Sequence, residues 1–345
     1  MNKSILVTGG NGYIGSHTLI SLCEASYTPI VIDNLSNSSR DSVKKVEDIT
    51  GKSIKFYDVD LRSIRDLIKI FGENNTDTDI IDAVIHFAGF KAVGESVDNP
   101  LTYYHNNING TITLLRVMKL FEIKKLIFSS SATVYGVPDV VPIKEDSKKS
   151  VTNPYGRTKL MVEEICHDIV NSKDGWRIVL LRYFNPIGAH PSGLIGENLS
   201  GVANNLMPYI LNVALGSENE LKIFGGDYNT EDGTGKRDYV HVMDIADGHV
   251  SALNWLSNQS EENICESFNL GTGKSISVLE LVEEFKRQTN IDIKYSIVDR
   301  RAGDIDESYA DVEKSKRILK WEAKRSLVDM VKDGWKSAKV DNNLS

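Results

Sequence analysis

The sequence predicts an α/β fold, in which a doubly wound parallel sheet is followed by a smaller C-terminal α/β domain. Over roughly the first 180 residues, short apolar runs alternate with helical stretches. Such alternation is typical of a parallel sheet with helices on both faces. The runs are continuously apolar, as strands buried on both faces should be. After Arg182 the sequence pattern changes: loops rich in Asn, Gly and Pro separate shorter elements. We therefore expect a first domain at residues 1–182 and a second at 183–345, with segments near 236–256 crossing back to the first.

The individual elements follow from these patterns. The expected strands are rich in Ile, Val, Leu and Phe, and they lie at residues 4–8, 29–33, 54–57, 83–87, 126–129 and 178–181. Apolar periodicity predicts helices at residues 101–121, 154–170, 242–256, 278–288 and 327–336. The second half contains two long loops, at residues 184–205 and 225–235.

Composition excludes several classes of protein. The chain has 345 residues and a formal net charge of −8, and it lacks a long Lys/Arg block, so we expect no nucleic-acid partner. No apolar run reaches the roughly 18–20 residues of a membrane span. The first residues meet glycines after three apolar positions, so a signal peptide is not expected. The three cysteines show no zinc or disulfide spacing. We expect a cytoplasmic protein without a membrane partner.

A glycine-rich turn follows the first expected strand. Gly9, Gly12 and Gly15 form the pattern GxxGxxG immediately before an amphipathic stretch. Glycines at this spacing let the chain turn tightly, so that backbone N–H groups and a helix N-terminus face a pyrophosphate. The turn predicts a Rossmann-type dinucleotide site.

Further candidate cofactor residues end the next strands. Asp33 ends the second strand, 21 residues after Gly12, where an acid hydrogen-bonds the adenosine ribose. A carboxylate there repels a 2′-phosphate, which favours NAD over NADP. Asp60, beside Leu61, follows the third strand and could accept from the adenine amino group. The sequence Phe87-Ala88-Gly89 ends the fourth strand, and its small residues would let a cofactor approach the backbone.

A candidate catalytic group lies on the next strand and helix. Tyr155 and Lys159 form a YxxxK pattern that opens a helix after Pro154, so both side chains share one face. Ser131 leaves the fifth strand at the expected cofactor edge. A cationic lysine and an oxidised nicotinamide would both lower the pKa of the tyrosine. Tyrosinate then becomes a usable general base, with the serine bound to the same substrate hydroxyl.

These residues resemble a known family. The blocks TGGNGYIG (8–15), SSSATVYG (129–136) and YGRTK (155–159) are similar to the extended short-chain dehydrogenase/reductases. Five longer blocks narrow the resemblance to the UDP-galactose 4-epimerase family: HFAGFKAVGESV (86–97), LRYFNPIGAHPSG (181–193), NNLMPYI (204–210), DGTGKRDYVHVMD (232–244) and NLGTG (269–273). The resemblance implies a tightly held NAD and interconversion of UDP-galactose and UDP-glucose through a 4-keto sugar. In that reaction the resemblance implies that Tyr155 is the base, that Ser131 is its hydrogen-bond partner, and that the charge of Lys159 lowers the pKa of Tyr155.

The resemblance also implies the binding residues. On the cofactor side it adds Tyr13, Ile14, Asn34, Asn37, Ser38, Lys91, Asn106, Ser129, Tyr183 and Phe184 to those above. On the UDP-sugar side it implies Asn185, Asn204, Asn205, Leu206, Phe224 near the uracil, Arg237, Tyr239, Arg301, Asp304 and Ser308, with the two arginines on the diphosphate. A homodimer is expected, because the family pairs the helices that correspond to residues 101–121 and 154–170.

One position bears on specificity. Ser308 matches a position in the wall of the sugar pocket, where a bulky tyrosine in some relatives excludes 2-acetamido sugars. Because serine is small, we expect UDP-GlcNAc and UDP-GalNAc to be substrates as well.

Other functions remain as alternatives. A nucleotide-sugar 4,6-dehydratase needs an Asp-Glu pair after the serine, and here Ala132-Thr133 follow Ser131. A UDP-glucuronate 4-epimerase or decarboxylase stays open. A redox-sensing module that holds NAD without turnover would be expected to lack the Tyr/Lys pair. A metal hydrolase is disfavoured, because the seven histidines show no ligand spacing, and no metal is expected.

Overall fold

The computed structural model describes residues 2–76, 79–199, 205–301, 304–342 and 344. Its main feature is a seven-stranded sheet of order β11-β6-β5-β4-β1-β2-β3, in which every neighbouring pair is parallel. The strands are β1 (Asn2–Thr8), β2 (Thr28–Asp33), β3 (Lys55–Asp58), β4 (Asp79–His86), β5 (Lys125–Ser131), β6 (Arg177–Tyr183) and β11 (Ile264–Leu270). The strand order reverses between β1 and β4. The predicted doubly wound parallel sheet is confirmed.

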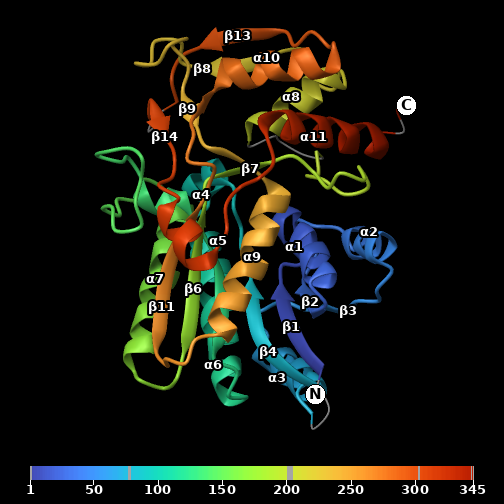
Figure 1. Ribbon diagram of the computed structural model, residues 1–345, viewed down its shortest axis with the longest axis vertical. Coiled ribbons are helices and arrows are strands. Elements are labelled where there is room, and N and C mark those ends of the chain that lie inside the picture. The colour runs from blue at the N-terminus through green and yellow to red at the C-terminus, as the bar shows by residue number, and fades with distance from the viewer. Residues whose placement is uncertain (1, 77–78, 200–204, 302–303, 343, 345) are drawn as a thin grey trace.

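Helices cover both faces of this sheet (Figure 1). The helices associated with it are α1 (Tyr13–Glu24), α2 (Asp41–Thr50), α3 (Ile64–Asn74), α4 (Val93–Asp98), α5 (Pro100–Tyr103), α6 (Gly110–Leu120), α7 (Pro154–Asn171) and α9 (Val242–Ser257). Short turns of 3₁₀ or π-helix lie at η1 (Tyr104–Asn109), η2 (Ala132–Tyr135) and η3 (Ser315–Leu319). α1 packs against α9 on one face, and α3, α6 and α7 lie on the other.

Successive side chains along each strand point to opposite faces of the sheet, so the strands contribute to two hydrophobic cores, one on each face. On β1, Ile5 and Val7 face the α1/α9 layer, whereas Leu6 faces the α3/α6/α7 layer. On β6, Val179 and Leu180 divide in the same way. Because both faces are covered, the strands read as continuous apolar runs.

The remaining elements form a smaller lobe above the carboxyl ends of the strands (Figure 1). Its helices are α8 (Leu206–Ala214), α10 (Val278–Thr289) and α11 (Leu327–Asp341). Its strands pair in small sheets and are β7 (Asn185–Ile187), β8 (Leu221–Phe224), β9 (Lys236–Arg237), β10 (Tyr239–His241), β12 (Ile276–Ser277), β13 (Tyr295–Val298) and β14 (Glu307–Ser308). A third core fills this lobe, around Ile210 and Phe285.

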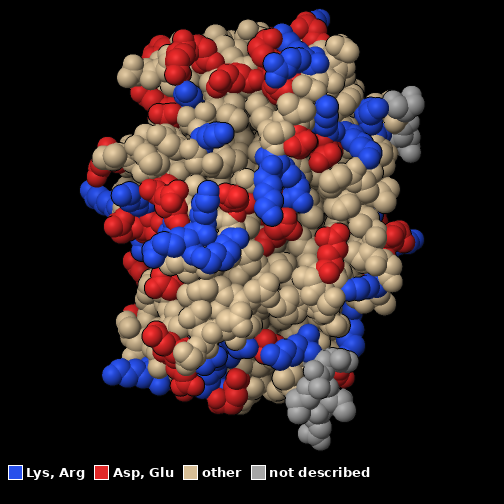
Figure 2. Space-filling view, in the orientation of Figure 1, with Lys and Arg blue, Asp and Glu red and all other residues tan. Residues whose placement is uncertain are grey.

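Two elements differ from the sequence-based expectation. The predicted helix at 101–121 is divided into α5, the π-helical turn η1 and α6. The sheet also has a seventh strand, β11, which returns from the second half of the chain to pair with β6. No helix within the described ranges is long and apolar enough to cross a membrane. Lys/Arg and Asp/Glu side chains are interspersed over the face shown in Figure 2.

Candidate active site

The glycine turn lies between β1 and α1, at the carboxyl edge of the sheet. Gly9 has a φ of +70°, which favours glycine, and its N–H donates to Ile32 O. A Cβ on Gly15 would lie 2.3 Å from the Gly9 carbonyl oxygen, so the turn closes only without side chains. Gly12 is the N-cap of α1, and no side chain caps the first turn. The N–H groups in the first turn of α1 therefore have no side-chain acceptor. They can bind an anion, such as the pyrophosphate of a dinucleotide.

Asp33 lies beside this turn at the end of β2. Its Oδ2 accepts from the Asn11 N–H at 3.0 Å. Its Oδ1 accepts from the Leu35 N–H at 3.0 Å and from the Ser38 hydroxyl at 2.9 Å. The carboxylate is thus oriented next to the glycine turn, where a ribose would lie.

Asp60 and Asn34 form a second polar group nearby. The Asn34 amide donates to Asp60 Oδ2 at 3.1 Å, and Asp60 forms an ion pair of 2.6 Å with Arg62. The hydrogen bond from Arg62 holds the pKa of Asp60 well below its usual range. Leu61 is buried, whereas Asn37 is exposed.

The chain after β4 passes close to the glycine turn. The N–H groups of Phe87 and Ala88 donate to Thr8 O at 3.0 and 3.2 Å. A Cβ on Gly9 would lie 2.6 Å from the Ala88 nitrogen, so small residues permit this approach. A Cβ on Gly89 would lie 3.3 Å from the Oδ1 of Asn107.

Asn107 was not predicted from the sequence, although its neighbour Asn106 was. Its amide donates to Thr158 Oγ1 at 3.0 Å and to Phe90 O at 3.1 Å, and it accepts from Asn106 at 3.1 Å. It therefore links η1 to α7 and to the chain after β4. The position of Asn107 inside a π-helical turn, a feature frequent at functional sites, becomes visible only in the structure.

Tyr155, Lys159 and Ser131 are brought together at the carboxyl end of β5. Asn153 caps α7 by accepting from Gly156 N at 2.8 Å, which places Tyr155 in the first turn. The Lys159 Nζ is 5.9 Å from the Tyr155 ring centroid, and it donates to Ser129 O at 2.6 Å. Lys159 is only 7% exposed.

The electrostatics of this group oppose proton loss from the tyrosine. Burial raises the pKa of Tyr155, and a hydrogen bond with Ser131 partly offsets the rise. Burial also lowers the pKa of Lys159 to about 8, against the attraction of Glu163. A positively charged ring bound beside Tyr155 would favour the phenolate, so the site fits oxidised nicotinamide.

Tyr183 and Phe184 line the same edge at the end of β6. The Tyr183 hydroxyl lies 2.6 Å from His249 Nε2 on α9, and the pair is buried. Phe184 donates from its N–H to Leu270 O at 3.1 Å. These contacts tie β6 to α9 and to β11 at the carboxyl edge of the sheet.

Four of the predicted UDP-sugar residues, Phe224, Arg237, Arg301 and Asp304, form a cluster in the smaller lobe. Arg301 Nε donates to Asp304 Oδ2 at 3.0 Å, and Arg237 lies 3.5 Å from the other oxygen of the same carboxylate. The Arg301 guanidinium also lies 4.8 Å from the Phe224 ring centroid. Two cations and an aromatic ring beside one another fit a nucleoside diphosphate.

Ser308 lies beside Arg237, because β14 pairs with β9 in register at these two residues. The Asp238 N–H donates to Ser308 O at 3.0 Å, and the Asn185 N–H donates to Asp238 O at 2.9 Å. Tyr239 is buried, and burial raises its pKa to about 12. The structure therefore places Ser308, Asn185 and Tyr239 around one short segment.

Two predicted residues lie on α8. Asn205 is its exposed N-cap, and Leu206 is its first residue. Asn204, also predicted, lies outside the described residues.

Lys91 joins the two lobes. It forms an ion pair of 3.2 Å with Glu197, and its Nζ lies 5.9 Å from the Tyr13 ring centroid. Tyr13 donates from its hydroxyl to Gly188 O at 2.6 Å. Glu197 was missed by the sequence prediction, because an acid in a Gly-rich loop carries no local signal. Ile14, on the first turn of α1, packs against the core below.

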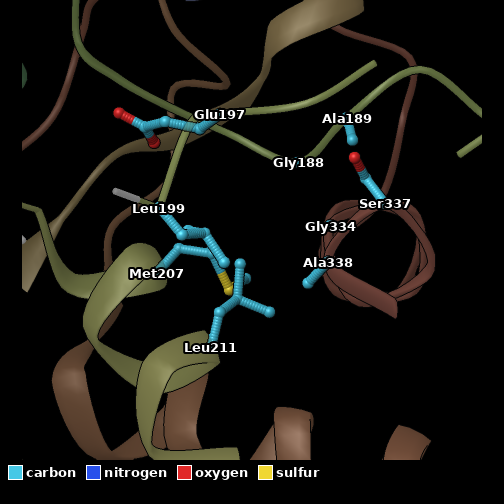
Figure 3. Close-up of a pocket in the computed structure, with 9 residues that line it drawn as sticks. All are labelled: Gly188, Ala189, Glu197, Leu199, Met207, Leu211, Gly334, Ser337 and Ala338. Atoms are coloured by element: carbon cyan, nitrogen blue, oxygen red, sulfur yellow. The ribbon is translucent and has the colours of Figure 1, made fainter. Parts of the chain in front are cut away.

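A small pocket lies beneath this junction (Figure 3). Leu199, Met207 and Leu211 face Ala338 of α11 across it, and the Glu197 carboxylate points away. Its volume of about 10 Å³ would hold roughly one water molecule. It is too small for a dinucleotide or a sugar nucleotide.

Tyr155, Lys159 and Ser131 share one sheet edge with the glycine turn and Asp33, and this arrangement is of the short-chain dehydrogenase/reductase type. Residues 6–334 match the family model described as GDP-mannose 4,6 dehydratase. The UDP-glucose 4-epimerase of Dictyostelium discoideum is 54% identical over 343 residues, covering 99% of this chain and 98% of that protein.

Solved structures agree with these sequence matches. The UDP-glucose-4-epimerase of Stenotrophomonas maltophila, with bound NAD and formylated UDP-arabinopyranose, has a TM-score of 0.95 at 44% identity. That of Bifidobacterium longum, in complex with NAD+ and UDP, has a TM-score of 0.92 at 46% identity. Each alignment covers 99% of both chains. The chain belongs to the UDP-glucose 4-epimerases, within the wider family of the GDP-mannose 4,6 dehydratase model. The predicted resemblance is confirmed.

Proposed function

We propose that the protein catalyses NAD-dependent 4-epimerisation of UDP-galactose and UDP-glucose. The observation that carries this proposal is the group of Tyr155, Lys159 and Ser131, in which Lys159 is buried and which shares the sheet edge with the glycine turn and Asp33. The arginine cluster of the smaller lobe supplies a complementary diphosphate site. The names of the relatives described above agree with this activity.

The residues of the chain act by positioning and proton transfer. Tyr155 takes the proton of the sugar 4′-hydroxyl, and Ser131 hydrogen-bonds the same oxygen. Lys159 lowers the pKa of the tyrosine by its charge. NAD, when bound, accepts the hydride of sugar C4 and returns it to the opposite face after the 4-keto sugar has turned. Tyr155 then gives its proton back, so the reaction is balanced without any further reagent.

Each lobe holds one ligand in this proposal. Residues 1–182 supply most of the NAD site and residues 183–345 most of the UDP-sugar site, and α9, near 236–256, packs back onto α1. NAD is bound by Gly9, Gly12, Tyr13, Ile14, Gly15, Asp33, Asn34, Asn37, Ser38, Asp60, Leu61, Phe87, Ala88, Gly89, Lys91, Asn106, Ser129, Tyr155, Lys159, Tyr183 and Phe184. The UDP sugar is bound by Ser131, Tyr155, Asn185, Asn204, Asn205, Leu206, Phe224, Arg237, Tyr239, Arg301, Asp304 and Ser308.

Substrates with a 2-acetamido group are included in the proposal. Ser308 is a small side chain next to Arg237, within the strand pair that adjoins the diphosphate cluster. A small residue at this place leaves room for the acetamido group of UDP-GlcNAc and UDP-GalNAc.

We also propose a cytoplasmic homodimer. Val97 on α4 and Leu101 on α5 are 60% and 81% exposed, and both helices pack beside α7. Large exposed apolar side chains on adjacent helices support a subunit interface there. Three free cysteines, Cys23, Cys166 and Cys265, are compatible with a reducing compartment. Light scattering at micromolar concentration tests the dimer, and a monomer would contradict it.

The test of the activity uses the purified protein without added cofactor. Turnover of UDP-galactose to UDP-glucose is expected, together with NAD in the extracted nucleotide fraction. UDP-glucuronic acid is the matched competing substrate. Preference for the glucuronate, or a strict need for added NAD, would contradict the proposal as stated.

A further inference from the structure

A fully buried ion pair lies one helical turn below the candidate catalytic group. Arg182 on β6 and Glu163 on α7 are 1% and 0% exposed. The guanidinium binds the carboxylate in a bidentate manner, at 2.9 Å from Nε and 2.8 Å from Nη2. Ser130 of β5 donates to the same carboxylate at 2.5 Å. Burial of two charges is unfavourable unless geometry and hydrogen bonds compensate, and here the bidentate contact and the Ser130 hydroxyl provide that compensation.

The pair is in register with the active site. Ser130, Arg182 and Asn269 are neighbours across β5, β6 and β11. The next row along these strands contains Ser131 and Tyr183. In the first row, Ser130 and Arg182 face α7, where both bind Glu163. In the second row, Tyr183 faces α9, whereas Ser131, at the end of its strand, hydrogen-bonds Tyr155 of α7. The ion pair therefore lies one residue along the strands from Ser131.

The spacing on α7 aligns three functional side chains. Tyr155, Lys159 and Glu163 are four residues apart, so they lie on one face of the helix, one turn above another. With Arg182 they form a row of groups whose charges alternate once Tyr155 is ionised, and Lys159, Glu163 and Arg182 are buried. Burial opposes the charge of Lys159, and the attraction of Glu163 counteracts it. Arg182 and Ser130 in turn hold the pKa of Glu163 below its usual range.

We propose that Glu163, held ionised by Arg182, is a positioning residue that keeps Lys159 cationic beside Tyr155. This inference rests on the proposed function, in which Tyr155 is the base. The pair thereby controls how readily the tyrosine loses its proton, although neither residue reaches the substrate.

Other titratable groups face this row from the packed elements. On β4, His86 lies close enough to Lys159 for its pKa to be lowered, mainly by burial and then by that charge. Lys149 lies 3.7 Å from Glu163, and Tyr135 accepts from Arg182 at 2.8 Å. Further neighbours are Tyr103 on α5, Tyr183 on β6, Cys265 on β11, Cys166 and His167 on α7 itself, and Glu145, whose carbonyl oxygen accepts from Arg182 at 2.8 Å. Glu163 is the carboxylate that acts on Lys159.

The test is the ionisation of Tyr155 in the NAD-loaded protein. Tyrosinate absorbance is followed against pH, and the Tyr155→Phe trace in the same background is subtracted. Glu163→Gln is expected to raise the midpoint by about one pH unit, because Lys159 becomes neutral more easily. At neutral pH, kcat for UDP-galactose is expected to fall about tenfold, with KM nearly unchanged. Glu163→Asp retains the negative charge, so its Tyr155 midpoint is expected to lie close to that of the wild type.

Ser267→Ala is the matched control. It removes one hydrogen bond to Arg182, at 3.1 Å, without changing any charge, and it is expected to leave the midpoint unchanged. An unchanged or lower midpoint in Glu163→Gln, or an equal shift in Ser267→Ala, would overturn the inference.

Two further measurements keep the test decisive. If Glu163→Gln does not fold, the double variant Glu163→Gln/Arg182→Gln removes both charges of the pair. It is expected to raise the midpoint by less than the rise expected for the single variant, because loss of the Arg182 cation favours the charged form of Lys159. The absorbance measurement needs no turnover. Absence of UDP-galactose turnover in the wild type therefore counts against the proposed function, while the midpoint still decides the role of Glu163.

Discussion

The Oδ1 atom of Asp238 accepts two hydrogen bonds from Thr272, one from its N–H at 2.8 Å and one from its hydroxyl at 2.7 Å. Oδ2 accepts from the N–H groups of Gly273 and Ala310, both at 3.1 Å. The carboxylate is fully buried and follows Arg237 directly. It therefore ties the loop after β11 and the chain after Ser308 to the strand that carries Arg237, which we propose to bind the diphosphate.

Replacement of Asp238 by asparagine is expected to loosen this junction. Two buried N–H groups would face an amide NH₂ in place of an acceptor. Each donor left without an acceptor lowers the free energy of unfolding by about 1–3 kcal/mol. We expect a fall of about 3 kcal/mol in unfolding free energy and a higher KM for UDP-galactose. Asp227→Asn is the control, because Asp227 is exposed and paired with Arg300. Equal stability of the two variants would contradict this role.

Tyr155→Phe removes only the hydroxyl of the proposed base. We expect kcat to fall by roughly 10²–10⁴, the usual contribution of general acid–base catalysis, while bound NAD is retained. Tyr27→Phe removes a hydroxyl that donates to Asn254 far from the site and should leave kcat unchanged. Full activity in Tyr155→Phe would favour a protein that binds NAD without using this tyrosine.

Ser308→Tyr tests the acetamido specificity. The larger ring is expected to occupy the space of the 2-acetamido group, so turnover of UDP-GlcNAc should fall selectively while UDP-galactose turnover persists. The ratio of the two kcat/KM values is the measurement. Failure of the wild-type protein to form UDP-GalNAc would show that a small residue here is not sufficient.

Three buried histidines predict acid sensitivity. Burial lowers the pKa of His17 and His249 to about 4 and that of His86 to about 3. The unfolded chain binds their protons near pH 6.5, so their stabilising contribution is complete above that pH and is lost as pH falls. A difference of three bound protons between the unfolded and folded states gives the unfolding free energy a slope of about 4 kcal/mol per pH unit near pH 5.

Denaturant unfolding at pH 6.5, 5.5 and 4.5 measures this slope. His17→Gln should reduce it by about one third, because one of the three protons is removed. His17 is the suitable choice, since its substitution disturbs a single hydrogen bond: Nδ1 lies 2.7 Å from Tyr13 O, and Nε2 has no partner. A stability that is flat over this range would contradict the assignment.

The features that could be read from the sequence are those that depend on local pattern. The glycine turn, Asp33 and the Tyr155–Lys159 spacing each combine a required backbone or side-chain type with a short separation along the chain. The strand and helix alternation likewise predicted the parallel sheet. β11 was not predicted, because Ile264–Leu270 contains Glu and Ser and pairs with a strand more than 80 residues away. The division of the helix at 101–121 was missed, because the contacts of Asn107 with Phe90 and Thr158 accompany η1 and are tertiary.

The sequence by itself determined the class of fold, the dinucleotide turn and the identity of the proposed base, because these follow from residue type at short spacing. Only the tertiary structure decided which charges support them. Glu163 meets Arg182 through the pairing of a helix with a strand, and Lys91 meets Glu197 across 106 residues. Asp238 finds its four donors in two other segments. Such partners have no local signal, because a buried charge is stabilised by whatever the fold places within hydrogen-bond distance.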